Sequence, residues 1–316
     1  MYILSAGGFL AVMYHYVRPF SDTKLRVFSE TDFNSQLDYF AENFGFVTKE
    51  DWLNFRLRGH IPQGVLLTFD DGLKDHFVTV MPELMKRRIF AVFYVNTDPL
   101  QGNPLSVHLV HWLLANSDIN QIFDFLLPRL KSKGFAINPH QYSQRIYESQ
   151  DYSLIEKQFK RLMNWTLKQK DSKMLLVDMF SHFAHISLQE FVKEWYLNER
   201  EVYQLFNNGF EIGSHTCSHS LLTNISDAEV NREILYSKRI LSDVLSSDIN
   251  SFCFPFGGPL SYNVNTIKVL EKSGYLEAFS VMPSTITTEI EKSSRFNLPR
   301  FDCTELPKTH MMQQDF

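Results

Sequence analysis

The spacing of hydrophobic residues changes twice along the chain. In the first and last thirds, short apolar runs typical of buried strands alternate with segments of helical periodicity; the runs are residues 11–15, 65–70, 89–95, 210–214, 252–254 and 276–281. Between Pro99 and about Asn208 only helical periodicity is left. Alternating strands and helices indicate parallel pairing, which places functional side chains at the carboxyl ends of the strands. The pattern predicts an α/β fold with a long helical insertion.

The expected helices differ in how clearly their ends are marked. In the alternating parts we expect helices over residues 33–43, 74–88, 226–245 and 263–272, and the third begins with the capping box Ser226-x-x-Glu229. In the middle we expect helices over residues 107–115, 119–132, 152–167 and 188–206. The last of these is opened by Ser187-x-x-Glu190, and Pro128 is expected to kink or end the second.

Composition and charge exclude several classes of protein. A net charge of −5 with scattered basic residues gives no electrostatic footprint for nucleic acid. No stretch approaches the ~18–20 apolar residues of a membrane span. The first ten residues are apolar but lack the basic region and cleavage site of a signal peptide, so we expect a cytoplasmic protein. Three cysteines without paired spacing argue against a disulfide framework.

Two polar motifs follow apolar runs that lie far apart in the sequence. Thr68-Phe69-Asp70-Asp71-Gly72 ends the run at 65–67, and His215-Thr216-Cys217-Ser218-His219 follows the run at 210–214. Alone, an Asp-Asp-Gly is an ordinary turn and a histidine pair is often structural. Together they offer two imidazoles and a carboxylate, a set that can hold a catalytic metal and leave positions open for water and substrate. The second aspartate is then free to act as a base.

These motifs resemble those of the polysaccharide deacetylases, also called the NodB-homology family or carbohydrate esterase family 4. The family's T-F-D-D-G is matched by residues 68–72 and its H-[ST]-x-x-H by residues 215–219. Its third motif, R-x-P-[YF]-G, keeps Pro255-Phe256-Gly257 but has Cys253 in place of the arginine. The resemblance covers residues 8–98 and 206–303. It implies a distorted (β/α) barrel of the NodB-homology type formed by residues 1–98 and 206–316.

The resemblance also implies roles for the motif residues. Asp71, His215 and His219 would hold a divalent metal, most simply Zn²⁺, with Co²⁺, Ni²⁺ or Mn²⁺ as alternatives. Asp70 would take a proton from the attacking water, and the backbone N–H of Phe256 would help to stabilise the oxyanion.

Three further positions near the Pro-Phe-Gly loop and the C-terminus complete the expected site. Pro255 and Gly257 would lie against substrate, with Gly257 allowing a close approach, and Asp302 would also bind substrate. In the resemblance, Arg300 would orient the catalytic aspartate in place of the arginine missing from the third motif. The alternative for Arg300 and Asp302 is a structural ion pair.

The general acid is the part of the family pattern that this sequence matches least well. The family's usual L-x-H motif near the C-terminus is missing, since Leu298-Pro299 is followed by Arg300. The branch that deacetylates poly-N-acetylglucosamine looks circularly permuted and carries this histidine near the N-terminus after a tyrosine. His15 follows Tyr14 and is therefore assigned as the acid, with a core histidine as the alternative.

Residues 99–205 are interpreted as a cap that shapes substrate access, and a dimerisation or stabilising module is the alternative. His108 and His111 share one face of an expected helix there and could meet substrate, although a packed or solvated face is the simpler account.

The function implied is a metal-dependent hydrolase that removes an N-acyl group, acetyl in the simplest case, from an N-acylated sugar in bacterial surface-glycan biosynthesis. The expected partner is that sugar, a glycan or a sugar-linked carrier, with no nucleic acid, no integral membrane segment and the oligomeric state left open. Hydrolysis of a non-sugar amide, as by allantoinase-like relatives, and an inactive glycan-binding protein are the alternatives.

Overall fold

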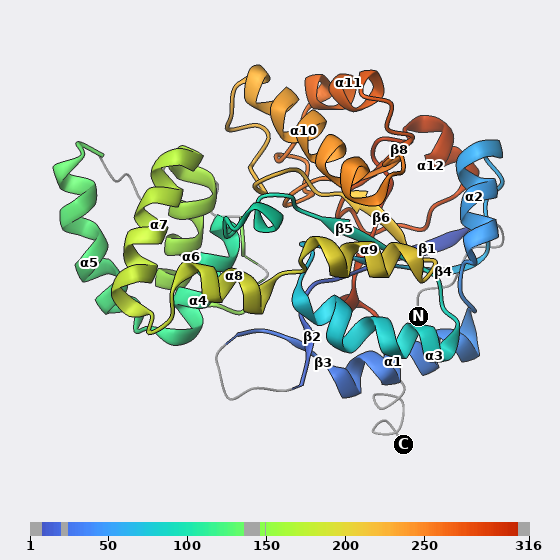
Figure 1. Ribbon diagram of the computed structural model, residues 1–316, viewed down its shortest axis with the longest axis horizontal. Coiled ribbons are helices and arrows are strands. Elements are labelled where there is room, and N and C mark those ends of the chain that lie inside the picture. Colours follow the sequence, from blue (N-terminus) through green and yellow to red (C-terminus); the bar gives the residue numbers. More distant parts are fainter. Residues whose placement is uncertain (1–7, 20–24, 136–145, 149, 309–316) are drawn as a thin grey trace.

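A curled sheet of parallel strands forms the centre of the molecule (Figure 1). The computed structural model describes residues 8–19, 25–135, 146–148 and 150–308. Its main sheet has seven strands in the order β8-β7-β6-β5-β4-β1-β9. These are β1 (Phe9–Tyr14), β4 (Gly64–Phe69), β5 (Ala91–Val95), β6 (Glu211–Ser214), β7 (Ser251–Cys253), β8 (Glu277–Phe279) and β9 (Phe301–Asp302). The short strands β2 (Val17–Arg18) and β3 (Phe28–Ser29) pair separately. The predicted barrel of the NodB-homology type is confirmed as a half-barrel.

Helices surround the curled sheet on its outer side (Figure 1). They are α1 (Glu30–Asn43), α2 (Lys49–Arg58), η1 (His76–Val80), α3 (Met81–Arg87), α9 (Glu199–Asn207), α10 (Asp227–Leu245), α11 (Val264–Lys272) and α12 (Thr288–Ser293). The short 3₁₀ helix η4 (Cys303–Glu305) follows β9. The capping box at Ser226 opens α10 as predicted. Helix α2 was not predicted; its Trp52 and Phe55 pack into the interior of the half-barrel.

Alternation along the strands decides which side chains enter the half-barrel. On β4, Val65, Leu67 and Phe69 belong to the outer apolar cluster, whereas Leu66 belongs to the inner one. Because successive side chains of a strand point to opposite faces, Thr68 and Asp70 share the inner side with Leu66. The alternation therefore places Asp70 on the inner side of the half-barrel, at the carboxyl end of the sheet.

The middle of the chain forms a separate group of helices beside the sheet, at the left of Figure 1. Their bounds are η2 (Pro99–Gln101), α4 (Ser106–Asn116), α5 (Ile119–Ser132), α6 (Leu154–Arg161), η3 (Leu162–Thr166), α7 (Gln169–Phe183) and α8 (Leu188–Trp195). Apart from η2, they share an apolar cluster that also includes Tyr16 and Leu73 from the barrel. Helix α7 was not predicted. Helix α5 does not end at Pro128, because a proline in the last turn removes only one backbone hydrogen bond.

The helix expected over residues 188–206 is two helices, so that expectation was wrong. Helix α8 opens with the predicted capping box at Ser187, but the chain leaves helical geometry at Tyr196 and resumes in α9. The break has a cause: the amide N–H of Leu197 donates to the carbonyl of Gly72 at 2.9 Å, and Leu73 and Tyr196 form an antiparallel bridge. The apolar side of α9, with Val202 and Leu205, belongs to the barrel core.

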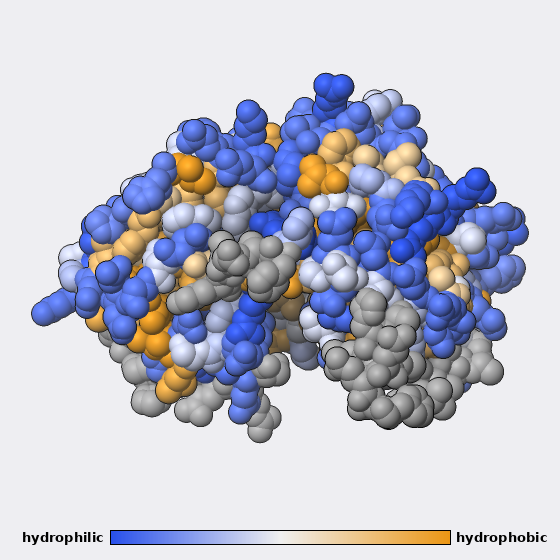
Figure 2. All heavy atoms as spheres, turned by 90° about the horizontal axis from the view of Figure 1, so that it is seen from below, coloured by the Kyte–Doolittle hydropathy of each residue, from blue (hydrophilic) through white to orange (hydrophobic). Residues whose placement is uncertain are grey.

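The surface seen in Figure 2 is mostly hydrophilic, with apolar side chains in small groups. Among the described residues, no helix has the length and apolar character needed to cross a membrane.

Candidate active site

Four parallel strands bring the sequence-predicted residues to one end of the half-barrel. β1 and β4 pair in parallel with Tyr14 opposite Phe69, so His15 and Asp70 emerge side by side. β6 leads into His215, and β7 leads through Cys253 into the Pro255-Phe256-Gly257 loop. The predicted parallel arrangement of the strands that end at His15 and Asp70 is confirmed.

Asp70 is held by Arg300 inside the barrel. The Arg300 guanidinium is 1% exposed and donates to both carboxylate oxygens of Asp70, at 2.8 and 2.7 Å. It also donates to Thr68 Oγ1 and to the Ser280 carbonyl, which fixes its plane. Burial alone would raise the pKa of Asp70, but the ion pair with Arg300 lowers it to about 2. Asp70 is therefore an oriented carboxylate at neutral pH.

Cys253 explains the departure from the family's third motif. Its thiol lies 2.8 Å from Arg300 Nη2 and 3.5 Å from Asp70 Oδ2. The guanidinium thus reaches Asp70 from Arg300, the residue before β9, while a small buried side chain lies at position 253.

Asp71, His215 and His219 converge as a ligand set that could hold a metal ion. The Nε2 atoms of His215 and His219 lie 3.4 and 3.5 Å from Asp71 Oδ1, which is buried and has no hydrogen-bond partner among the described residues. His215 Nδ1 must donate to the Cys253 carbonyl at 2.8 Å, so in the neutral ring, the form that binds a metal, Nε2 carries the lone pair. Burial lowers the pKa of His219 to about 3, so its imidazole is neutral.

This arrangement fits a divalent cation. A buried carboxylate oxygen without a hydrogen bond, facing two imidazole nitrogens, would be costly unless a cation completes it. Asp70, His215 and Cys253 also lie close enough together to form a second possible ligand group. The Arg300 guanidinium already compensates the charge of Asp70, however, so the set with Asp71 is the better metal site.

His108, from the insertion, binds the other oxygen of Asp71. Its Nε2–H donates to Asp71 Oδ2 at 3.0 Å, and its Nδ1 accepts from the hydroxyl of Tyr196 at 2.7 Å. The Tyr196 oxygen in turn accepts from the backbone N–H of Leu105 at 3.1 Å. His108 is fully buried, and with His219 it lowers the pKa of Asp71 well below its usual value against the opposing effect of burial.

Four side chains at the site lie on strained backbone. Asp71, Thr216, His219 and Phe256 have positive φ angles of 75°, 68°, 55° and 62°, and they are four of seven such non-glycine residues among those described. Residues in this region are costly and persist only where the surroundings hold them. The strain is concentrated where the site is built.

His15 lies at the mouth of the site. Its Nε2 is 4.0 Å from Asp71 Oδ2, and about a third of its side chain is exposed. Its carbonyl accepts from Nε2–H of the buried His76 at 3.0 Å, which fixes the backbone at this point. The position suits a group that exchanges protons with a bound substrate, although the role itself stays a prediction.

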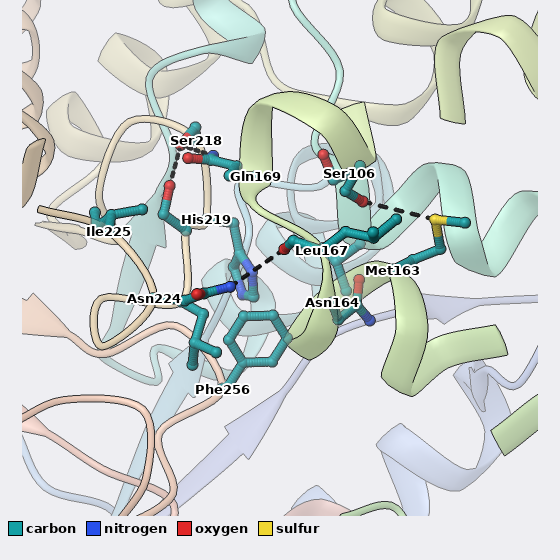
Figure 3. A pocket seen from close by; sticks show the side chains of 14 residues that line it. Ser106, Met163, Asn164, Leu167, Gln169, Ser218, His219, Asn224, Ile225 and Phe256 are labelled. Atoms are coloured by element: carbon teal, nitrogen blue, oxygen red, sulfur yellow. Dashed lines mark hydrogen bonds between the residues drawn. The ribbon is translucent and has the colours of Figure 1, made fainter. Parts of the chain in front are cut away.

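The Pro-Phe-Gly loop carries Phe256 against the ligand set. The Phe256 ring packs edge-on against His219, with ring centroids 4.8 Å apart. It also packs at a tilt against Trp165 of the insertion, with centroids 5.5 Å apart. Figure 3 shows His219 and Phe256 side by side, with Asn224 reaching the carbonyl of Leu167. A Cβ at Gly257 would lie 2.7 Å from Val281 Cγ1, so this glycine is needed for packing against Val281. Pro255 belongs to the same loop.

A cavity of about 330 Å³ joins these parts. The barrel contributes His15, Asp70, Asp71, His215, His219, Phe256 and Asp302 to its lining. Asp302 also caps η4, with its Oδ1 accepting from the backbone N–H of Thr304. His111 lines the cavity from the insertion, and Nδ1 of His111 lies 2.9 Å from the Tyr16 hydroxyl.

His108 and Tyr196 are the site residues that the motifs did not identify. The available signal for His108 was that it shares a helical face with His111. The apolar neighbours on that helix, however, favoured a packing role over a role in the site. Tyr196 gave no signal, since the break between α8 and α9 that turns it inward depends on a contact with Gly72.

Comparisons with known proteins agree with this geometry. The family described as polysaccharide deacetylase matches residues 183–278, which include the His215–His219 motif and the Pro-Phe-Gly loop. The putative polysaccharide deacetylase YxkH of Bacillus subtilis (strain 168) is 24% identical over 94 residues, 30% of this chain and 33% of that protein. The match thus spans only about a third of the length of this curated relative.

Solved structures share the fold over nearly the whole chain. The Streptococcus pyogenes deacetylase PplD, solved in complex with acetate, has a TM-score of 0.57 at 16% identity and covers 96% of this chain and 94% of its own. The deacetylase domain of BpsB from Bordetella bronchiseptica has a TM-score of 0.55 at 13% identity, with 93% and 95% covered.

The fold places Asp70, Asp71 and His15, which lie outside the matched segment, beside His215 and His219 inside it. The family resemblance indicated by the motifs is therefore confirmed as a similarity: the chain resembles the polysaccharide deacetylases in its motifs, in residues 183–278 and in its fold.

Proposed function

We propose that this protein is a metal-dependent hydrolase that removes an N-acetyl group from an N-acylated sugar or glycan. The observation that carries the proposal is the convergence of Asp71 Oδ1 with the Nε2 atoms of His215 and His219. These three side chains lie beside the carboxylate of Asp70, which Arg300 keeps ionised and oriented. Similarity to the polysaccharide deacetylases over residues 183–278 supports an N-acylated sugar as the substrate.

Asp71, His215 and His219 would hold the ion, for which Zn²⁺ fits the nitrogen and oxygen donors and Co²⁺, Ni²⁺ or Mn²⁺ are alternatives. When bound, such an ion lowers the pKa of water and stabilises negative charge that develops on the amide oxygen. His108 orients Asp71 by binding Oδ2, so that Oδ1 is directed at the two imidazoles.

The chain's own groups would move the protons. Asp70 accepts a proton from the attacking water, since its carboxylate stays ionised and each oxygen keeps a lone pair beyond its bond to Arg300. His15, at the mouth of the same cavity, donates a proton to the leaving amine. The backbone N–H of Phe256 faces the oxyanion in this proposal, and Pro255, Gly257 and Asp302 shape the sugar site.

Release of acetate from a panel of N-acetylated glycans, including the intermediates of bacterial surface-glycan assembly, tests the proposal. The panel includes allantoin, a non-sugar ureido compound, so that hydrolysis of a non-sugar amide is scored in the same assay. We expect acetate from one or more glycans, and loss of this activity in Asp70→Asn and after treatment with a chelator. A protein that binds glycans but releases no acetate with any divalent ion would refute the assignment.

A further inference from the structure

The insertion forms a second wall of the catalytic cavity, and that wall is chemically different from the barrel wall. His111, Tyr147, Gln150 and Lys160 line the cavity from the insertion side. Asp70, Asp71 and Asp302 line it from the barrel side, where Glu305 also contributes. The cavity is thus acidic at the catalytic end and basic at the end formed by α6.

Lys160 is the only lysine or arginine among the described residues that line this cavity, and it is 3% exposed. Its Nζ donates to Gln150 Oε1 at 2.7 Å and lies 4.6 and 4.2 Å from the ring centroids of Tyr147 and Tyr152. In the part of the chain that the structure describes, no carboxylate lies within ion-pairing distance of this amine. A buried lysine is rare without a paired negative charge.

The surroundings do not supply that charge. The Arg26 guanidinium lies 4.2 Å from the same Tyr152 ring, and the carboxylate that pairs with it, Asp151, is fully exposed. Burial, followed by the charge of Arg26, lowers the pKa of Lys160 to about 7, and Glu156 opposes this effect only in part. The site would therefore gain from an anion brought by a ligand.

Tyr147 is held in a fixed orientation beside the amine. Its hydroxyl oxygen lies 3.1 Å from Asn164 Nδ2 and 3.1 Å from Trp165 Nε1, both of which donate to it. The Trp165 ring contacts Phe256 of the catalytic loop, so the basic end of the cavity and the ligand set are joined by a packed chain of aromatic rings.

We propose that Lys160, with Gln150 and Tyr147, forms a subsite for an anionic group, a carboxylate or a phosphate, that the glycan carries beside its N-acylated sugar. The proposal rests on the proposed function and adds the substrate class. The carboxylates of Asp302 and Glu305 on the barrel side would repel the same group, so the two sides of the cavity would set the direction in which the glycan binds.

Three probes test the subsite: chitotriose, which is neutral; a trisaccharide in which glucuronic acid flanks N-acetylglucosamine; and N,N′-diacetylchitobiose 1-phosphate. We expect kcat/KM to be at least tenfold higher for one of the two anionic probes, and which of them is preferred distinguishes a carboxylate from a phosphate. Lys160→Met should reduce the ratio of anionic to neutral kcat/KM at least tenfold through KM, and Lys160→Arg should restore part of it.

Lys157→Met is the matched control, because Lys157 lies on the same helix, is not among the described residues that line the cavity, and its Nζ bonds only to the Glu148 carbonyl among described residues. It should leave the ratio unchanged. A purely structural Lys160 would lower the rates for all three probes by the same factor, which would overturn the proposal.

Equilibrium binding of the same probes to chelator-treated protein tests the anionic subsite separately from the proposed hydrolase activity, because binding needs no turnover. We expect Lys160→Met to weaken binding of the preferred anionic probe at least tenfold. Proton uptake should accompany that binding near pH 8 in the wild type only, since a nearby anion raises the pKa of Lys160 from about 7. The groups that face this amine and could contribute to the proton count are His111, Tyr147, Tyr152 and Glu156.

If no probe releases acetate yet the anionic probe binds in a Lys160-dependent way, the proposed activity fails and the subsite stands. Equal binding of all three probes by the wild type would overturn the subsite alone.

Discussion

The pair formed by Asp70 and Arg300 is the best-defined interaction of the site, and removing one partner should be more damaging than removing both. Both side chains are almost fully buried, at 2% and 1% exposed, and two hydrogen bonds join them. Arg300→Met keeps the length of the side chain but leaves the Asp70 carboxylate without its cation. Asp70→Asn keeps the volume and leaves the guanidinium without its anion.

The expected magnitude follows from this burial. Breaking a buried ion pair by removing one partner costs about 3–5 kcal/mol, since it leaves an uncompensated charge. The pKa of Asp70, lowered from 3.8 to about 2, corresponds to about 2 kcal/mol in favour of the ionised form in the folded state. That stabilisation is complete above the unfolded pKa of about 4 and is lost as the pH falls toward 2. Arg300→Met should therefore reduce stability at pH 7 more than at pH 2.5.

Urea unfolding of the wild type, both single variants and the double variant Asp70→Asn/Arg300→Met measures the coupling between the two side chains. We expect about 2 kcal/mol or more, with the double variant more stable than the sum of the single changes implies. The matched control is the pair of Arg129 and Asp178, joined at 2.7 Å but 39% and 53% exposed. Its coupling should be below about 1 kcal/mol.

A coupling as small for the buried pair as for the exposed one would refute this account of Arg300. Activity gives a second readout: Asp70→Asn should lower turnover by about 10²–10⁴-fold while the protein keeps its bound metal. Loss of the metal in Asp70→Asn would instead mean that the roles of Asp70 and Asp71 are reversed.

Three further predictions concern the histidines. His219→Ala should abolish stoichiometric binding of Zn²⁺, measured as metal content after dialysis, and retention of a full equivalent would contradict the ligand set. His15→Ala should slow amide hydrolysis strongly but spare an ester with a good leaving group, which needs little protonation; equal losses on both would indicate a structural histidine. His108→Leu should weaken Zn²⁺ affinity about 10–100-fold in a chelator competition, because Asp71 loses the bond that orients it, whereas the exposed His185→Leu should have no effect.

The convergence of Asp71, His215 and His219 could be predicted because strand periodicity and motif act on the same positions. Alternation along β4 directs Leu66, Thr68 and Asp70 inward, and the following glycine permits the turn that presents Asp71. The parallel order of β1 and β4 then brings His15 to the same end. Strand alternation and parallel pairing can both be inferred from the sequence where an apolar run ends in a polar motif.

The contributions of the insertion could not be predicted in the same way. His108 and Lys160 lie on helices whose periodicity indicates packing, and neither belongs to a motif of the resemblance. Their importance arises from contacts over long sequence separations, such as that between His108 and Asp71. Helical periodicity shows which face of a helix is buried but not what it is buried against.

The division of the chain into a barrel and a cap, which stays a prediction, is consistent with where the strain of the site is held. Asp71, His219 and Phe256 occupy left-handed backbone conformations, which need support from surrounding contacts. That support includes the insertion: His108 bonds to Asp71, and Trp165 packs against Phe256, which contacts His219. A barrel alone would retain the ligands but not the contacts that hold their backbone in place. The insertion is therefore expected to matter for the geometry of the site as well as for access to it. Lys160, on the insertion, lines the same cavity.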